Sequence, residues 1–349
     1  MTSLIYYSST FKNFIKRDSI ISTLESKYLE ELISSCHPTD LFINSIWGEL
    51  DNTLIELIKL KPSRAIVYSG MDWENTVCRK EFNDYISKNV KNIVHIGNSD
   101  GEGYFSFWLF FTEKYFASYP IEQVEFNNPK HLYMCLNRKR HSHRVTLVDR
   151  LKEEGLLEYG LVSLGGDSEK KIPQLNLKAD AKEVDGNKAT DYKPGDIPND
   201  ISSIGDLTNW NNTLINVVTE TTTHTSTFIS EKTWKPIVGL RPFMIVGDYK
   251  IYSYLKEYGI DTFDDIFGTG YEHPWVHNRI EWVINNLKKY SNTNLLDMYK
   301  DLYPRLVKNK TQLQKIFKIN SIKYCKVVDL IKKNEFYVYF KKNISSIWM

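Results

Sequence analysis

Short apolar runs that alternate with segments of helical period constrain the fold of this chain more than any other feature. The runs "RAIVYS" at 64–69 and "NIVHIG" at 92–97 have the length and the β-branched content of strands. Ahead of them, "NTLIELIKL" at 52–60 places apolar residues three to four apart, as on one face of a helix. Strands that alternate with helices predict an α/β fold in which helices cover a parallel sheet.

The alternation occurs in two sets, which predicts two domains. The second set begins with "HLYMCL" at 131–136 and includes the apolar run "PFMIVG" at 242–247. A chain of 349 residues is also longer than one core comfortably needs. We therefore expect an N-terminal domain at 1–130, a second domain at 131–320 and C-terminal helices at 321–349 that cross back to the first domain.

One long segment interrupts the second set. Residues 165–210 have few large apolar side chains, several glycines and prolines, and many charges. Such a composition is typical of a surface loop, so we interpret this segment as a polar excursion or lid.

Composition narrows the cellular setting and the partners. The net charge of +2 is too small for a global field to select nucleic acid or membrane, so an anionic partner needs a local basic cluster. The densest apolar run, "FSFWLFF" at 105–111, is too short to span a bilayer. No two of the four cysteines form a C-x-x-C pair, so we expect a cytoplasmic protein without disulfides or a zinc knuckle.

The segment "TFISEKTWKPIVGLRPFMIVGD" at 227–248 predicts a helix start at a ligand site. Ser230 is a candidate N-cap, which places Glu231 and Lys232 in the first turn with the unpaired backbone N–H groups. Lys232 and the helix dipole favour a phosphate, whereas Glu231 suits a hydroxyl donor such as a ribose diol. A Ser-Glu-Lys start is also common in helices that bind no ligand, so the motif needs support from other residues.

A basic loop, "NRKRHSHR" at 137–144, follows the apolar run at 131–136. The loop is a candidate for meeting a diphosphate or a nucleic-acid backbone, although a solvated basic loop would look the same. His141 and His143 form an H-x-H pair without a third ligand at suitable spacing, so we expect no metal site. The cationic residues of this loop are Arg138, Lys139, Arg140 and Arg144.

These motifs resemble the nucleotide-sugar half of the alpha-fucosyltransferase-like glycosyltransferases of GT-B fold. The likeness covers 132–151 and 215–247. Glu220 matches the family's acid at the end of one strand, and Glu231 and Lys232 match its Glu-Lys helix start. Trp234, Pro242 and Gly247 match the following large residue and the Pro-led strand that ends in Gly.

The resemblance implies two Rossmann-like domains that face each other across a cleft, the second of which binds the nucleotide sugar. It implies that Glu231 holds the ribose, that Lys232 holds a phosphate and that Arg144 meets the diphosphate. His224 is a further candidate contact to the base or the phosphate. Similar segments occur in phage and virus proteins of this type, so a viral source and the host cytoplasm are implied as well.

The transfer reaction needs a base that deprotonates the acceptor hydroxyl. Candidate carboxylates stand in "SGMDWEN", with Asp72 and Glu74, and in "GNSDGEG", with Asp100 and Glu102. Each is more often an ordinary turn acid, and we choose Asp72 because Trp73 beside it can stack on a sugar or a base.

Two other functions stay open at the level of sequence. A metal-dependent GT-A transferase would use Asp100 and Glu102 near a divalent cation, whereas the expected enzyme needs no cofactor beyond its nucleotide sugar. A non-catalytic nucleic-acid-binding protein would use the basic loop at 137–144. The acceptor can be a glycan, a protein or a hydroxymethylated base in viral DNA, and the motifs choose neither the donor sugar nor the stereochemical outcome.

Overall fold

A computed structural model gives the fold of the chain, which is a mixed α/β protein with parallel sheets and helices. The chain divides into two compact units, Met1–Phe110 with Phe317–Met349, and Phe111–Ile316. The structure describes residues 5–8, 36, 40–44, 52–62, 64–69, 77–97, 126, 129–137, 140–165, 175–177, 207–223 and 229–333.

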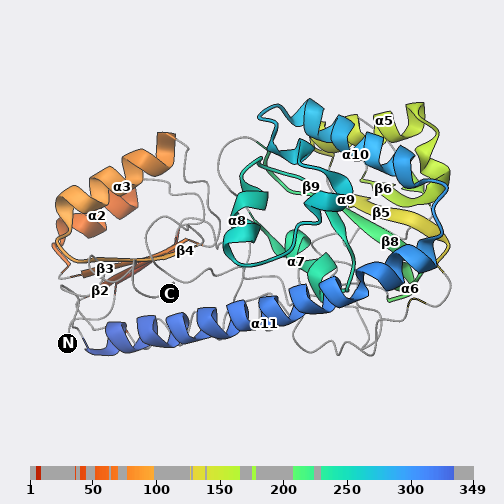
Figure 1. The fold of residues 1–349 in the computed structure, drawn as a ribbon. Coiled ribbons are helices and arrows are strands. Elements are labelled where there is room, and N and C mark those ends of the chain that lie inside the picture. Colours follow the sequence, from red (N-terminus) through yellow and green to blue (C-terminus); the bar gives the residue numbers. More distant parts are fainter. Residues whose placement is uncertain are drawn as a thin grey trace. The chain divides into compact units, whose positions relative to one another are not determined.

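The first unit contains a four-stranded sheet in the order β1-β2-β3-β4. All three strand pairs are parallel. Helices α2 and α3 lie on the same side of this sheet (Figure 1), as right-handed crossovers between sequential neighbours require. The elements are β1 Ile5–Ser8, β2 Asp40–Asn44, α2 Asn52–Lys59, β3 Arg64–Ser69, α3 Val77–Asn89 and β4 Ile93–Gly97.

An apolar core and one buried ion pair hold this unit together. Leu41 and Ile43 of β2 and Ala65 and Val67 of β3 are fully buried against residues of α2 and α3 such as Phe82. Asp40 and Arg64 stand opposite each other where β2 and β3 begin. Arg64 donates Nε to Asp40 Oδ1 at 3.1 Å, and both side chains are buried. Because a lone buried charge is costly, each residue compensates the other.

The second unit contains a five-stranded sheet in the order β7-β6-β5-β8-β9. Only the β6–β7 pair is antiparallel among the strands that the structure describes. From β5 the chain first moves to β6, and later returns to the other side of β5 to form β8 and then β9. The strands are β5 His131–Asn137, β6 Gly160–Leu164, β7 Leu175–Leu177, β8 Thr213–Thr219 and β9 Phe243–Val246.

Helices cover both faces of this second sheet (Figure 1). Helices α5 and α10 lie on one face, and α6 and α7 lie on the other. Every residue of β6 and β9 is buried, as expected for strands covered on both sides. The remaining elements are α5 Ser142–Glu153, η2 Leu156–Tyr159, α6 Leu207–Asn212, α7 Glu231–Val238, α8 Ile251–Glu257, α9 Asp264–Phe267, η4 Gly270–Glu272, α10 Val276–Tyr290 and α11 Leu295–Lys333.

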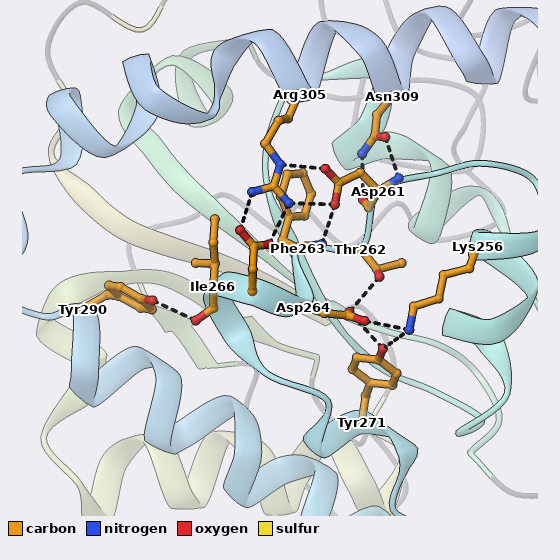
Figure 2. Close-up of polar contacts among 11 residues, drawn as sticks. Lys256, Asp261, Thr262, Phe263, Asp264, Ile266, Tyr271, Tyr290, Arg305 and Asn309 are labelled. Atoms are coloured by element: carbon orange, nitrogen blue, oxygen red, sulfur yellow. Dashed lines mark hydrogen bonds and ion pairs between the residues drawn. The ribbon is translucent and has the colours of Figure 1, made fainter.

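A polar network joins α11 to the segment before and within α9 (Figure 2). The Arg305 guanidinium donates to both Asp261 and Asp265, at 2.6 to 2.9 Å. One turn further along α11, Asn309 Oδ1 accepts from Asp261 N and Asn309 Nδ2 donates to Asp261 O. Because one planar guanidinium binds two carboxylates, the contact is both strong and restricted in its orientation.

Most predicted elements are confirmed, and three features were not foreseen. "DLFIN" forms β2, whose short apolar run gives a weak signal. Within the expected excursion at 165–210, β7 and part of α6 form. Helix α11 continues without a break from the second predicted domain into the segment after residue 320, because no Gly or Pro between residues 305 and 333 ends it.

Candidate functional site

The candidate site lies where the strand order of the second sheet reverses. From β5 the chain winds outward in one direction through β6 and in the other through β8 and β9. In open α/β sheets, ligands bind at such a point, outside the carboxyl ends of the strands. Asn137 ends β5 and Thr219 ends β8, and Asn137 Oδ1 accepts a hydrogen bond from Thr219 Oγ1 at 2.5 Å.

Glu220, the residue after β8, is fully buried and holds the start of α7. Its Oε1 accepts from Ser230 N at 3.0 Å and from Thr233 Oγ1 at 2.7 Å. Its Oε2 accepts from Ser230 Oγ at 2.6 Å. These protein donors use both carboxylate oxygens, so the structure gives Glu220 the role of fixing α7 on the end of β8.

Ser230 is the N-cap of α7, which confirms the prediction from sequence. Ser230 Oγ accepts from Lys232 N at 3.3 Å while it donates to Glu220. The same oxygen accepts from Lys232 Nζ at 3.0 Å. The hydroxyl therefore uses its one hydrogen and both lone pairs, and it fixes the side chain of Lys232 beside the helix start.

Glu231 and Lys232 form an ion pair of 3.0 Å in the first turn of α7. About a third of the Lys232 side chain is exposed, at 32%, so its charge faces both the protein and solvent. Burial acts to raise the pKa of the Glu231 carboxyl, but the charges of Lys232 and Lys235 outweigh it and hold the pKa below its usual value. Glu231 is therefore an ionised hydrogen-bond acceptor at neutral pH.

Arg144 and His143, from the first turn of α5, bind the main chain that leaves β8. The Arg144 guanidinium donates to Thr219 O at 3.0 Å and to Glu220 O at 3.3 Å. His143 Nε2 lies 2.8 Å from Glu220 O, and because a carbonyl only accepts, this nitrogen carries the proton. Arg144 is buried, so it positions the segment that carries Glu220.

Arg279 holds the same segment from α10. Its guanidinium donates to Thr223 O at 2.8 Å, and the whole residue is buried. Burial lowers the pKa of Arg279, and the Asp248 carboxylate beyond β9 opposes that effect. Side chains from α5 and α10 thus bind the carbonyls at 219–223, while the Glu220 carboxylate binds α7.

Gly247, directly after β9, allows Glu220 to approach closely. A Cβ at this position would lie 2.5 Å from Ile251 Cδ1 and 3.2 Å from Glu220 Cβ. These separations are shorter than ordinary van der Waals contact, so a side chain here would displace its neighbours. The glycine that ends the Pro-led strand therefore lets Ile251 and Glu220 pack closely against this turn.

The structure brings several predicted residues together at this edge. Arg144 comes from α5, Glu220 directly follows β8, and Glu231 and Lys232 come from α7, so these residues are joined from segments far apart in sequence. Arg140 also reaches the edge, where its Nη1 donates to Gly165 O at 3.2 Å, just after β6. The other predicted residues, Asp72, Arg138, Lys139 and His224, lie outside the described residues.

Sequence reasoning did not assign Asn137 or Arg279 to this site. Asn137 is the first polar residue after the apolar run of β5, which is a signal that could have found it. Arg279 lies near the start of the amphipathic helix α10, at a position on the helix's buried face. That position does not indicate which carbonyls the guanidinium binds.

The described residues contain no group of three or more His, Cys, Asp or Glu side chains arranged to hold a metal ion. His141 and His143 stack with ring centroids 5.9 Å apart. In the same part of the chain, no helix combines the length and the apolar character needed to cross a membrane.

Comparison of the chain with protein-family models, with curated proteins and with solved structures gives no match.

Proposed function

We propose that the protein is a glycosyltransferase that moves a sugar from a nucleotide-sugar donor to a hydroxyl acceptor. The observation that carries this proposal is the position of Glu231 and Lys232, in the first turn of α7 at the carboxyl edge of the second sheet. A partly exposed ammonium and an ionised carboxylate side by side match the diphosphate and the ribose diol of one nucleotide.

The chemistry follows from the charges at this corner. As the bond from the anomeric carbon to the diphosphate breaks, negative charge accumulates on the leaving oxygen. Lys232 and the positive end of the α7 dipole stabilise that charge, and Lys232 is preorganised because Ser230 and Glu220 fix the helix start. Glu231 accepts hydrogen bonds from the ribose hydroxyls, and Arg144 holds the main chain beneath the site.

The rest of the arrangement is part of the same proposal. Two Rossmann-like domains face each other across a GT-B cleft, the first unit binds the acceptor, and Asp72 is the candidate base. The acceptor is a glycan or a hydroxymethylated base in viral DNA, the setting is the cytoplasm of a host cell, and no metal takes part.

A donor-hydrolysis and transfer assay tests the proposal. Purified protein is incubated with UDP-, GDP-, CDP- and ADP-sugars, with glycan or hydroxymethylated DNA as acceptor, in the presence and absence of excess chelator. We expect release of a nucleoside diphosphate that persists in chelator and falls about tenfold to a thousandfold in Lys232→Met. Lys300→Met, which removes an exposed cation on α11, is the matched control and should leave the rate unchanged.

Two results would contradict the proposal. Activity that chelator abolishes would favour a metal-dependent transferase. DNA affinity that falls steeply with salt, together with no release of nucleotide, would favour a nucleic-acid-binding protein.

A further inference from the structure

Trp275 stands out among the described residues as an aromatic side chain left in solvent. It precedes α10 and is 72% exposed, although indole rings are usually mostly buried. The other exposed large aromatic residues in the described ranges are Tyr249, directly after the carboxyl end of β9 and its Gly-Asp turn, and Tyr303 on α11. Tyr249 therefore belongs to the edge of the sheet that carries the candidate site.

The segment before Trp275 is fixed from one side by Tyr271 of η4 (Figure 2). Tyr271 OH donates to Asp264 Oδ1 at 2.9 Å and accepts from Lys256 Nζ at 2.7 Å. Its ring is buried and stacks on Tyr252, with centroids 3.6 Å apart. Gly270 packs so closely on Trp282 that a Cβ would lie 2.4 Å from Trp282 Cδ1.

The segment is fixed from the other side by the buried Arg279. Its Nη1 donates to His273 O at 2.6 Å and to Pro274 O at 2.9 Å, the two carbonyls directly before Trp275. Its Nη2 donates to Thr223 O at 2.8 Å, three residues after Glu220. One guanidinium thus joins the backbone at Trp275 to the segment whose other contacts fix the start of α7.

This arrangement fixes the backbone that carries the exposed indole and links it through Arg279 to the segment after Glu220. Because that backbone is already held, less conformational entropy is lost when a ligand stacks on the ring. A flat aromatic surface suits a flat π-system, and the nucleobase is the flat part of a nucleotide sugar. Trp275, the N-cap of α10, and Lys232, in the first turn of α7, belong to the same unit, whose sheet carries α10 on one face and α7 on the other.

We propose that Trp275 is the stacking surface for the nucleobase of the donor nucleotide. This assignment rests on the proposed function, because it requires that a nucleotide occupies the α7 corner. Stacking uses the flat face of the ring, which every nucleobase has. Trp275 therefore contributes affinity, whereas other groups select among the bases.

Isothermal titration calorimetry with UDP, GDP, CDP, ADP and inorganic pyrophosphate tests the assignment. For the nucleoside diphosphate that binds wild type, Trp275→Ala should weaken affinity about fivefold to a hundredfold and leave pyrophosphate affinity unchanged. Trp275→Phe keeps a ring and should stay within about threefold of wild type. Tyr303→Ala, which removes an exposed aromatic ring of α11, is the matched control and should change nothing.

The outcomes separate this assignment from the proposed function. If wild type binds a nucleoside diphosphate and Trp275→Ala binds it equally well, the assignment fails and the proposed function stands. Equal weakening of pyrophosphate, or a change confined to the KM of the acceptor, would also overturn it. If wild type binds neither nucleotide nor pyrophosphate, both the proposed function and the assignment fail.

Discussion

The Glu220 carboxylate holds Ser230 by two hydrogen bonds, 3.0 Å from the backbone nitrogen and 2.6 Å from the hydroxyl oxygen. Glu220 follows β8 and Ser230 begins α7, so this contact sets where the helix starts relative to the sheet. The hydroxyl that Glu220 holds also binds Lys232 Nζ. A buried carboxylate thus fixes a partly exposed cation through the hydroxyl of Ser230.

Glu220→Gln should destabilise the protein by about 1 to 3 kcal/mol. The NH₂ group of Gln would face a donor from which a carboxylate oxygen accepts a hydrogen bond, so at least one buried donor would be left unpaired. The free energy of unfolding from urea denaturation measures the effect. Glu257→Gln on α8 is the exposed control and should stay close to wild type. A loss below about 0.5 kcal/mol for Glu220→Gln would mean that the contact does not fix α7.

Gly247→Ala should lower the free energy of unfolding by about 1 to 3 kcal/mol, because its new methyl group overlaps Ile251 and Glu220. Adding Ile251→Val removes the nearest atom, Ile251 Cδ1, but leaves the contact with Glu220 Cβ. We therefore expect urea denaturation to give the double variant a lower free energy of unfolding than Ile251→Val alone. Equal values for these two variants would show that Gly247 serves Ile251 alone.

The pH dependence of the free energy of unfolding should reflect the ionisation of the Asp264 carboxyl. Burial acts to raise the pKa of this carboxyl, but hydrogen bonds from Lys256, Thr262 and Tyr271 outweigh it and lower the pKa. A carboxyl whose pKa is lower in the folded state stabilises the fold above the unfolded pKa, and that stabilisation is lost as pH falls through the folded pKa.

Asp264→Asn should accordingly be less stable than wild type at pH 7, by about 1 to 3 kcal/mol, and the difference should shrink below about pH 4. Thermal melts from pH 7 to pH 2.5 measure both curves, with the exposed Asp301→Asn on α11 as control. Parallel curves for Asp264→Asn and wild type would contradict the role assigned to this carboxylate.

Arg144 and Lys232 should differ in what they contribute. Lys232→Met should lower kcat about tenfold to a thousandfold with little change in Tm, because its side chain is partly exposed and acts on the leaving group. Arg144→Met should lower both kcat and Tm, because it removes donors from two buried carbonyls.

A double-mutant cycle on donor hydrolysis tests whether the two residues serve one site. Both act on the geometry around a single diphosphate, so the combined loss should be smaller than the sum of the separate losses. Additive losses of a few tenths of a kcal/mol would mean that the two cations are independent.

Local signals made much of the second unit predictable from sequence. The apolar runs of β5, β8 and β9 are buried on both faces, so they stand out without knowledge of their neighbours. Ser230 was predicted as an N-cap because capping depends on residues within one turn of it.

The contacts that build the site were less predictable, because they join segments far apart in sequence. Nothing near Glu220 indicates that its carboxylate is used up by Ser230 and Thr233, or that Arg144 binds carbonyls 75 residues away. For the same reason, the sequence pattern gives no sign that Arg144 and Glu220 are buried and bonded to protein groups. Long-range hydrogen bonds depend on the strand order, which periodicity does not reveal.

The most direct test of the account is the affinity of wild type, Glu231→Gln and Lys232→Met for UDP-, GDP-, CDP- and ADP-sugars, measured by calorimetry. We expect at least one nucleotide sugar to bind wild type, and each variant to bind it about 1.5 to 3 kcal/mol more weakly, as for hydrogen bonds to charged groups. The Glu231→Gln loss should vanish when the ribose hydroxyls of the ligand are removed. Failure of every nucleotide sugar to bind wild type, or unchanged affinity in both folded variants, would contradict the central claim that the start of α7 is a nucleotide-sugar site.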